Sequence, residues 1–189
     1  WWMLGLLGRS VVAGAGLSLH HFIDDHMVLQ RAPLSARVFG NASSGSQVTV
    51  ALKGVGEWVA TADTRGRFAV VLGPQPAGSG HTLTVSDGDA TLTLTDIAFG
   101  DVYLCTGQSN MEFSLNAAFN ASAEIADSVN YPNLRLATVA NRFSPTEMED
   151  ADPISNYTDS TGRVKAWRRS EPDAFAPATS TTFSYFSAV

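Results

Sequence analysis

The chain has 189 residues, with 12 Lys and Arg against 18 Asp and Glu, for a net charge of −6. Hydrophobic residues make up 44% and charged residues 16%, a balance typical of a globular protein rather than a disordered one. The acidic balance and the lack of a Lys/Arg run argue against a nucleic-acid partner. Cys105 is the only cysteine, which excludes an internal disulfide framework and a cysteine-based zinc site.

Residues 1–18 form an apolar leader rich in small residues and interrupted by Arg9 and Ser10. The leader contains an Ala13-Gly14-Ala15 stretch similar to a signal cleavage segment. The chain, however, begins with Trp1 rather than Met and lacks the basic start of a signal peptide. We interpret the region as the tail of a secretion signal or as a mispredicted gene start. Its glycines and Arg9 argue against a stable membrane span.

Three Asn-x-Ser/Thr sequons lie at Asn41, Asn120 and Asn156. Such triplets are acceptor sites for N-glycosylation, which takes place in the secretory pathway. Together with the apolar leader, the sequons predict a glycoprotein that is secreted or lysosomal.

Residues 19–97 have the pattern of a β domain. Three segments alternate apolar and polar residues, as half-buried strands do: Gln47–Lys53, His81–Val85 and Thr91–Thr95. Asp87-Gly88, between the last two, is the strongest hairpin signal in the chain. Residues 57–62 and 67–72 form another candidate strand pair, and residues 73–80 a loop. Short strands without a helical period predict an antiparallel β-sandwich.

The pattern changes near residues 97–100. Val102–Cys105 is apolar on both faces, which predicts a buried strand of a parallel sheet and a buried, inert Cys105 thiol. Residues 117–129 predict a helix and residues 134–139 a second strand, giving one β-α-β unit. Residues 98–189 are therefore expected to form an α/β domain, with fewer strands than a doubly wound sheet needs.

Residues 141–178 are polar and interrupted by prolines. A loop of this length is usually functional or lies over another part of the molecule, and Trp167 is its expected anchor. We interpret the acidic residues 147–152 as a solvated surface. A further helix, capped by Thr181 or Thr182, is expected near the end of the chain.

Ser109 follows the predicted strand on a Gly107-Gln108-Ser109-Asn110 turn. Open α/β sheets place reactive groups at such turns, where backbone N–H groups can face a developing oxyanion. On the local pattern alone, however, a serine that caps the turn is the better explanation.

A serine nucleophile needs a base that takes its proton. The chain has four histidines, all in the β region and none after Ser109: His20, His21, His26 and His81. We do not expect one of them to reach Ser109. A metal site in residues 20–26 is also disfavoured, because His21 and His26 would point to opposite faces of an extended segment. We interpret that stretch as a polar turn and expect no metal.

The block Gly-Asp-Val-Tyr-Leu-Cys-Thr-Gly-Gln-Ser-Asn-Met-Glu at residues 100–112 resembles the nucleophile block of the sialate O-acetylesterases, within the SGNH/GDSL hydrolase group. Asp25–Gln30 is similar to the amino-terminal β-domain signature of that family. Phe119–Ser122 and Tyr185–Val189 also match in order and spacing, so the resemblance spans residues 19–189.

The resemblance implies an esterase that removes O-acetyl groups from sialic acids or related sugars without a metal or cofactor. It implies Ser109 as the nucleophile, with its own backbone N–H in the oxyanion hole and Gly107, Gln108 and Asn110 forming the turn. The histidine-bearing block of the family, its partner acid and its other oxyanion donors have no match in this sequence.

We therefore expect an amino-terminal fragment that is inactive by itself. Its expected parts are a leader (1–18), a β-sandwich domain (19–97) and an incomplete SGNH-type, flavodoxin-like α/β hydrolase domain (98–189). Two other functions stay open: a non-catalytic carbohydrate-binding or interaction module, and an acetylesterase that acts on other acetylated polysaccharides.

Overall fold

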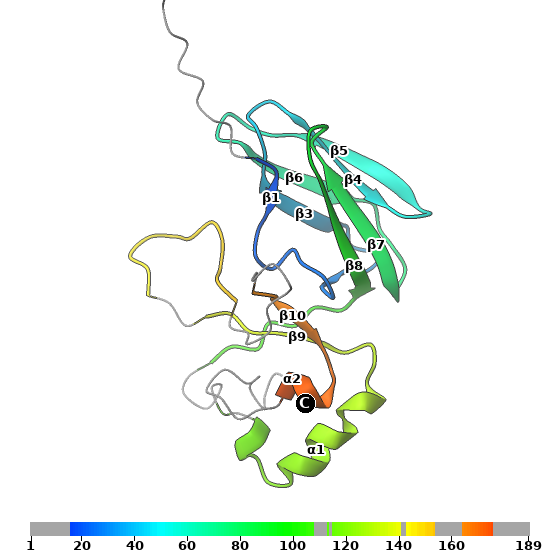
Figure 1. Cartoon of the computed structure of the whole chain (residues 1–189), viewed down its shortest axis with the longest axis vertical. Helices are drawn as coiled ribbons and strands as arrows, with labels where there is room; N and C mark the ends of the chain where they lie inside the picture. Colours follow the sequence, from blue (N-terminus) through cyan, green and yellow to red (C-terminus); the bar gives the residue numbers. More distant parts are fainter. Residues whose placement is uncertain (1–15, 108–112, 114, 141–142, 154–163, 176–189) are drawn as a thin grey trace, which may run out of the picture.

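The structure is a computed structural model that describes residues 16–107, 113, 115–140, 143–153 and 164–175. It is mostly β, with a few short helices. Figure 1 shows strands β1 to β8 in one body and the elements from α1 to α2 in a second, smaller part beside it. Within these ranges, no helix has the length and apolar character needed to cross a membrane.

The first body consists of two sheets. The smaller sheet has the order β1-β3-β6, with bounds Ser18–Leu19, Ala36–Asn41 and Arg67–Leu72. The larger has the order β2-β8-β7-β4-β5, with bounds Val28–Gln30, Thr91–Gly100, Gly78–Ser86, Gln47–Leu52 and Gly56–Thr61. Figure 1 shows the two sheets facing each other.

Both sheets contribute to one apolar core. In β3 and β6 every second side chain is buried, so Val38 and Val70 face inward while the residues between them face solvent. Val50 and Val85 of the larger sheet are fully buried in the same cluster. The two sheets thus enclose a shared core, as the period-2 pattern predicted. A separate sandwich domain that ends at residue 97 stays a prediction.

The pairing of the strands is antiparallel except at one position. β2 lies parallel to β8, with Val28 opposite Ala98 and Gln30 opposite Gly100. A parallel pair needs a long crossover rather than a hairpin, and the chain between the two strands supplies it. The prediction of a purely antiparallel arrangement is wrong for β2.

The Asp87-Gly88 hairpin is confirmed. Ser86 pairs with Thr91 at the end of the β7–β8 ladder, and the Asp87 N–H donates to the Ala90 carbonyl at 3.3 Å. Gly88 has a φ of 95°, a conformation that glycine adopts without a steric cost.

The predicted pairing of residues 57–62 with 67–72 is wrong, although both strands form. β5 pairs with β4 in the larger sheet and β6 pairs with β3 in the smaller one. The connection between them crosses from one sheet to the other. Asp63 stabilises this turn, because its Oδ1 accepts hydrogen bonds from the Arg65 and Arg67 N–H groups at 2.8 and 2.9 Å.

The second part contains short elements. Its helices are η2 (Leu115–Ala117), α1 (Ala121–Asp127), η3 (Ser128–Asn130) and α2 (Pro172–Phe175). The helix predicted at 117–129 is thus present but interrupted, because Asn120 has a left-handed backbone with φ 61°. Four buried apolar residues form its core: Leu115, Leu136, Ala174 and Phe175.

The strand predicted at 134–139 forms as β9 (Arg135–Ala137), but its partner differs from the prediction. β9 pairs antiparallel with β10 (Trp167–Arg169), a strand that the sequence analysis did not predict. The predicted parallel β-α-β unit is therefore wrong for the part of the chain that the structure describes. The helix expected after Thr181 lies outside the described residues.

Candidate active site

The segment that leads to the candidate nucleophile leaves β8 at Gly100. Residues 101–107 have irregular backbone structure and are exposed, Gly107 included. Ser109, with its neighbours Gln108 and Asn110, lies outside the described residues. The assignment of Ser109 as a nucleophile therefore stays a prediction.

The prediction of a buried strand at Val102–Cys105 is wrong. Tyr103 and Leu104 are each 81% exposed, and Cys105 is exposed, so the predicted buried thiol is wrong as well. A strand with two apolar faces is buried only where neighbouring strands and helices cover it. Among the strands that the structure describes, none pairs with this segment.

The start of this segment is fixed to the first body. The Arg31 guanidinium donates to both carboxylate oxygens of Asp101 at 2.9 and 3.2 Å, and the Arg31 N–H donates to the Gly100 carbonyl at 3.1 Å. Gly100 also closes the parallel β2–β8 pair. Whatever position Ser109 takes, the chain reaches it from this point.

A buried ion cluster joins the second part of the chain to the first. The Lys165 Nζ lies 2.9 Å from Asp24 Oδ1 and 2.8 Å from Asp25 Oδ2, and the Ala166 N–H donates to Asp24 Oδ2 at 3.1 Å. Asp24 is fully buried. Burial alone lowers the pKa of Lys165, but its hydrogen bonds to Asp25 and Asp24 raise that pKa above its ordinary value. Lys165 therefore stays charged and is the shared counter-ion of the buried Asp24 carboxylate and the half-buried Asp25 carboxylate.

Asp96 forms a second ionic junction. Its Oδ2 lies 2.8 Å from His26 Nδ1, 3.0 Å from Arg135 Nη2 and 2.7 Å from Arg169 Nε. Burial raises the pKa of this carboxyl, yet the hydrogen bonds from Arg169 and His26 and the charges of both arginines outweigh burial and lower the pKa to about 2. One carboxylate thus connects β8 with β9 and β10.

Trp167 anchors the long polar segment, as predicted. Its Nε1 donates to the Phe22 carbonyl at 2.8 Å, and its ring packs against the core of the first body. Contacts at both ends of β10 therefore determine its position: Trp167 bonds to Phe22 and Arg169 bonds to Asp96.

The prediction of a solvated acidic surface holds for Glu149, which is exposed although it pairs with an arginine, and is wrong for Asp150, which is half-buried in a specific contact. Glu149 Oε1 lies 3.0 Å from Arg67 Nη1, and Asp150 Oδ2 lies 2.8 Å from His21 Nδ1. The predicted polar turn at residues 20–26 is confirmed between β1 and β2, and it is also a contact surface for the second part of the chain.

The histidines serve packing and ion-pair roles in the described structure. His20 and His21 face Asp150, His26 bonds to Asp96, and His81 lies edge-on to Phe99 with ring centroids 5.4 Å apart. Because Asp96 is shared with two arginines, its bond to His26 fits an attachment role. Within the described ranges, no three His, Cys, Asp or Glu side chains gather as metal ligands do.

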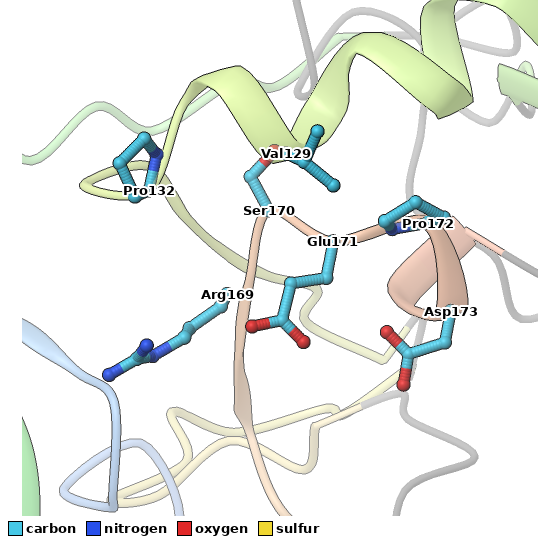
Figure 2. A pocket seen from close by; sticks show the side chains of 7 residues that line it. All are labelled: Val129, Pro132, Arg169, Ser170, Glu171, Pro172 and Asp173. Carbon is cyan, nitrogen blue, oxygen red and sulfur yellow. The ribbon is translucent and has the colours of Figure 1, made fainter.

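A pocket of about 490 Å³ lies in the second part, where β10 leads into α2. Its lining residues come from two stretches: Val129 and Pro132, and the run from Arg169 to Asp173. Figure 2 shows the Arg169 guanidinium turned away from the carboxylates of Glu171 and Asp173. These groups can hydrogen-bond a polar ligand, but the sequence analysis singled out none of them as functional.

The sequons differ in accessibility. Asn120 is exposed, on the turn before α1, whereas Asn41 is half-buried at the end of β3. Asn156 lies outside the described residues. The structure leaves the Asn120 side chain accessible to a glycan.

The fold is shared with a solved enzyme of carbohydrate chemistry. No protein-family model matches the chain. A carbohydrate acetylesterase from Xanthomonas citri, known from a crystal structure, superposes with a TM-score of 0.73 and is 26% identical. The match covers 88% of this chain and 34% of that enzyme's chain. The chain therefore shares its fold with part of a carbohydrate acetylesterase.

The curated relatives are more specific. Sialate O-acetylesterase from Rattus norvegicus is 34% identical over 163 residues, which is 80% of this chain and 30% of the relative. The Homo sapiens enzyme of the same name is 34% identical over 150 residues, covering 73% of this chain and 28% of the relative. The chain thus resembles sialate O-acetylesterase, as the sequence predicted, and spans about 30% of the length of these relatives.

The sequence analysis missed the attachment residues of the second part: Lys165, Arg135 and Arg169. Each pairs with an acidic residue 39 to 141 positions away. No fixed spacing marks such a pair in a single sequence. The sequence analysis did single out residues 20–26, which contain the Lys165 partners Asp24 and Asp25. It interpreted that stretch as a polar turn and not as a contact with a distant lysine.

Replacing Lys165 with Met should destabilise the protein by about 3 kcal/mol, because Asp24 would keep a buried charge without its counter-ion. Arg31→Gln is the matched control: it removes an exposed ion pair with Asp101, which water screens and which contributes far less than a buried pair. Urea unfolding at neutral pH measures both. Equal losses in the two variants would contradict the role assigned to Lys165.

Asp96 should make stability depend on pH under acidic conditions. Its pKa in the folded protein, about 2, is lower than the ordinary value of 3.8. The stabilisation is therefore fully present above about pH 4 and is lost as pH falls through about 2, a change of about 2 kcal/mol. Urea unfolding at a series of pH values tests this. In Asp96→Asn, which is less stable at every pH, the slope between about pH 4 and 2 should be shallower, and an unchanged slope would contradict the assignment.

Proposed function

We propose that this chain is part of a serine carboxylic ester hydrolase that removes O-acetyl groups from sialic acids. The observation that carries the proposal is the similarity to sialate O-acetylesterases over 73–80% of the chain, together with the Gly-Gln-Ser-Asn block at residues 107–110. The fold shared with a carbohydrate acetylesterase supports the same class of substrate.

In the proposed reaction, the Ser109 Oγ attacks the carbonyl carbon of the acetyl ester while a base takes its proton. The tetrahedral intermediate expels the sugar hydroxyl and leaves an acetyl group on Ser109. Water then attacks this acetyl-enzyme and releases acetate. The Ser109 backbone N–H stabilises the oxyanion, and Gly107, Gln108 and Asn110 shape the turn that presents it.

The proposed domain organisation has a leader at 1–18, a β domain at 19–97 and part of an SGNH-type hydrolase domain from residue 98. Tyr103 and Leu104 are exposed apolar side chains. The further strands of such a hydrolase domain would cover them, and this supports the proposed organisation. The base, its partner acid and the remaining oxyanion donors would come from elsewhere in the whole protein. The chain by itself is accordingly inactive in this proposal.

The full-length protein that contains this chain should release acetate from O-acetylated sialic acid. Ser109→Ala should lower this rate by about a thousandfold or more, because no other group in the proposal can form the acyl intermediate. The control is Ser44→Ala, at an exposed position between β3 and β4 and outside every sequon, which should retain the parent rate. Acetate release and binding of the same sugar are measured for both.

Two outcomes would contradict parts of this proposal. If Ser109→Ala retains the parent rate, the nucleophile is another residue. If the full-length protein binds the glycan without releasing acetate, the non-catalytic carbohydrate-binding module is the better description.

An esterase for other acetylated carbohydrates is the second candidate. It is favoured by the structural neighbour, whose name specifies a carbohydrate acetylesterase without a sialic acid substrate. The two candidate functions are distinguished by rate constants measured on O-acetylated sialic acids and on acetylated plant polysaccharides. The substrate class with the higher rate constants identifies the function.

We also propose that the protein is glycosylated in the secretory pathway and is secreted or lysosomal. Asn120, Asn41 and Asn156 are the proposed acceptors, and the exposure of Asn120 supports its use. In secretory expression, Asn120→Gln should remove one glycan and increase electrophoretic mobility by one step. Asn116→Gln, a nearby asparagine without a sequon, is the control. Identical mobility of the two variants would contradict glycosylation at Asn120.

A further inference from the structure

The segment of residues 143–153 lies against the first body. The segment follows β9 and is fastened at its end, where the Ala140 N–H donates to the Asp152 carbonyl at 2.8 Å and Val139 forms a bridge with Pro153. The remaining contacts that the structure gives this segment with the first body come from Glu149 and Asp150.

Apolar packing contributes little to this docking. Phe143 is 96% exposed and Met148 is 53% exposed, so neither side chain is withdrawn from water. Hydrophobic stabilisation is roughly proportional to the apolar area removed from water. Glu149 and Asp150 therefore supply the side-chain contacts by which the middle of the segment meets the first body.

Asp150 binds a surface made of two histidines. The His21 N–H donates to both carboxylate oxygens, at 3.2 Å to Oδ1 and 3.1 Å to Oδ2. The His21 Nδ1 lies 2.8 Å from Oδ2, and the His20 Nδ1 lies 3.9 Å from Oδ1. The His20 ring is held in turn against Phe39, edge-on, with centroids 5.0 Å apart.

We propose that these contacts form a proton-sensitive latch, in which Asp150 holds residues 143–153 against His20 and His21 more tightly at acidic pH than at neutral pH. The proposal is independent of the esterase function.

The physical reason is the change in imidazole charge. Histidine is the side chain that ordinarily gains its charge between pH 8 and 5, while aspartate carboxylates stay ionised over that range. The bond from His21 Nδ1 to the ionised Asp150 carboxylate is charge-assisted in both states, and a protonated imidazole adds a coulombic attraction between opposite charges. This added attraction favours the docked segment at acidic pH.

The other charged groups at this contact do not reverse the effect. Arg67 pairs with Glu149 at 3.0 Å and with Asp63 at 2.8 Å, and such pairs keep their charges between pH 5 and 8. Asp152, the next carboxylate along the segment, also keeps its charge over this range. The Arg67–Glu149 pair therefore gives a constant attachment, and the histidines provide the pH-dependent part.

Amide hydrogen exchange of the complete chain tests the latch. The readout is the opening constant of peptides within 143–150, normalised at each pH to an unstructured peptide, with a β3 peptide as the internal reference. For the native chain we expect an opening constant about two- to fivefold smaller at pH 5.5 than at pH 7.5, the size of one exposed charge pair. Far-UV circular dichroism confirms that each variant is folded.

Three variants separate the latch from a general effect of pH. His20→Gln/His21→Gln should abolish the pH difference in this segment, whereas His81→Gln, in β7 against Phe99, should keep it. Glu149→Gln should increase opening at both pH values and leave their ratio unchanged. Equal normalised opening constants at the two pH values in the native chain would overturn the proposal, and so would an undiminished difference in the double histidine variant.

Discussion

The structure depends on the buried carboxylate of Asp24. A carboxylate withdrawn from water is strongly destabilising unless a counter-ion and hydrogen-bond donors replace its hydration. Lys165 and the Ala166 N–H supply both, and they come from a part of the chain more than 140 residues later. The second part must therefore return to the first for Asp24 to be satisfied, and β10 follows directly from that contact.

The second part has few other sources of cohesion. Its own core holds four buried apolar residues, whereas the first body has a large core shared by two sheets. The second part relies on Asp96, which binds arginines from β9 and β10, and on Trp167, which reaches the first core. An assembly held by charges responds to pH more than one held by apolar packing, and both the acid sensitivity of Asp96 and the proposed latch at Asp150 follow from this.

The candidate nucleophile connects these observations to function. The chain leaves β8 at Gly100, beside the Arg31–Asp101 pair, and the proposed catalytic turn follows within ten residues. The first body and the Arg31–Asp101 pair thus fix the point from which the chain continues toward Ser109. In the proposed hydrolase domain, further strands would cover Tyr103 and Leu104, which are exposed in the described part of the chain.

The sequence by itself determined strands β4 to β8 of the first body, the Asp87-Gly88 hairpin, the Trp167 anchor and the resemblance to sialate O-acetylesterase, because alternation, turn chemistry and motifs are local properties of the chain. Only the tertiary structure decided that β5 and β6 lie in different sheets, that β9 pairs with β10, and that residues 102–105 are exposed. It alone also showed that Asp24 meets Lys165 and that Asp150 meets His21. Strand partners and ion pairs depend on which distant segments come into contact. Neither periodicity nor residue spacing in a single sequence predicts those contacts.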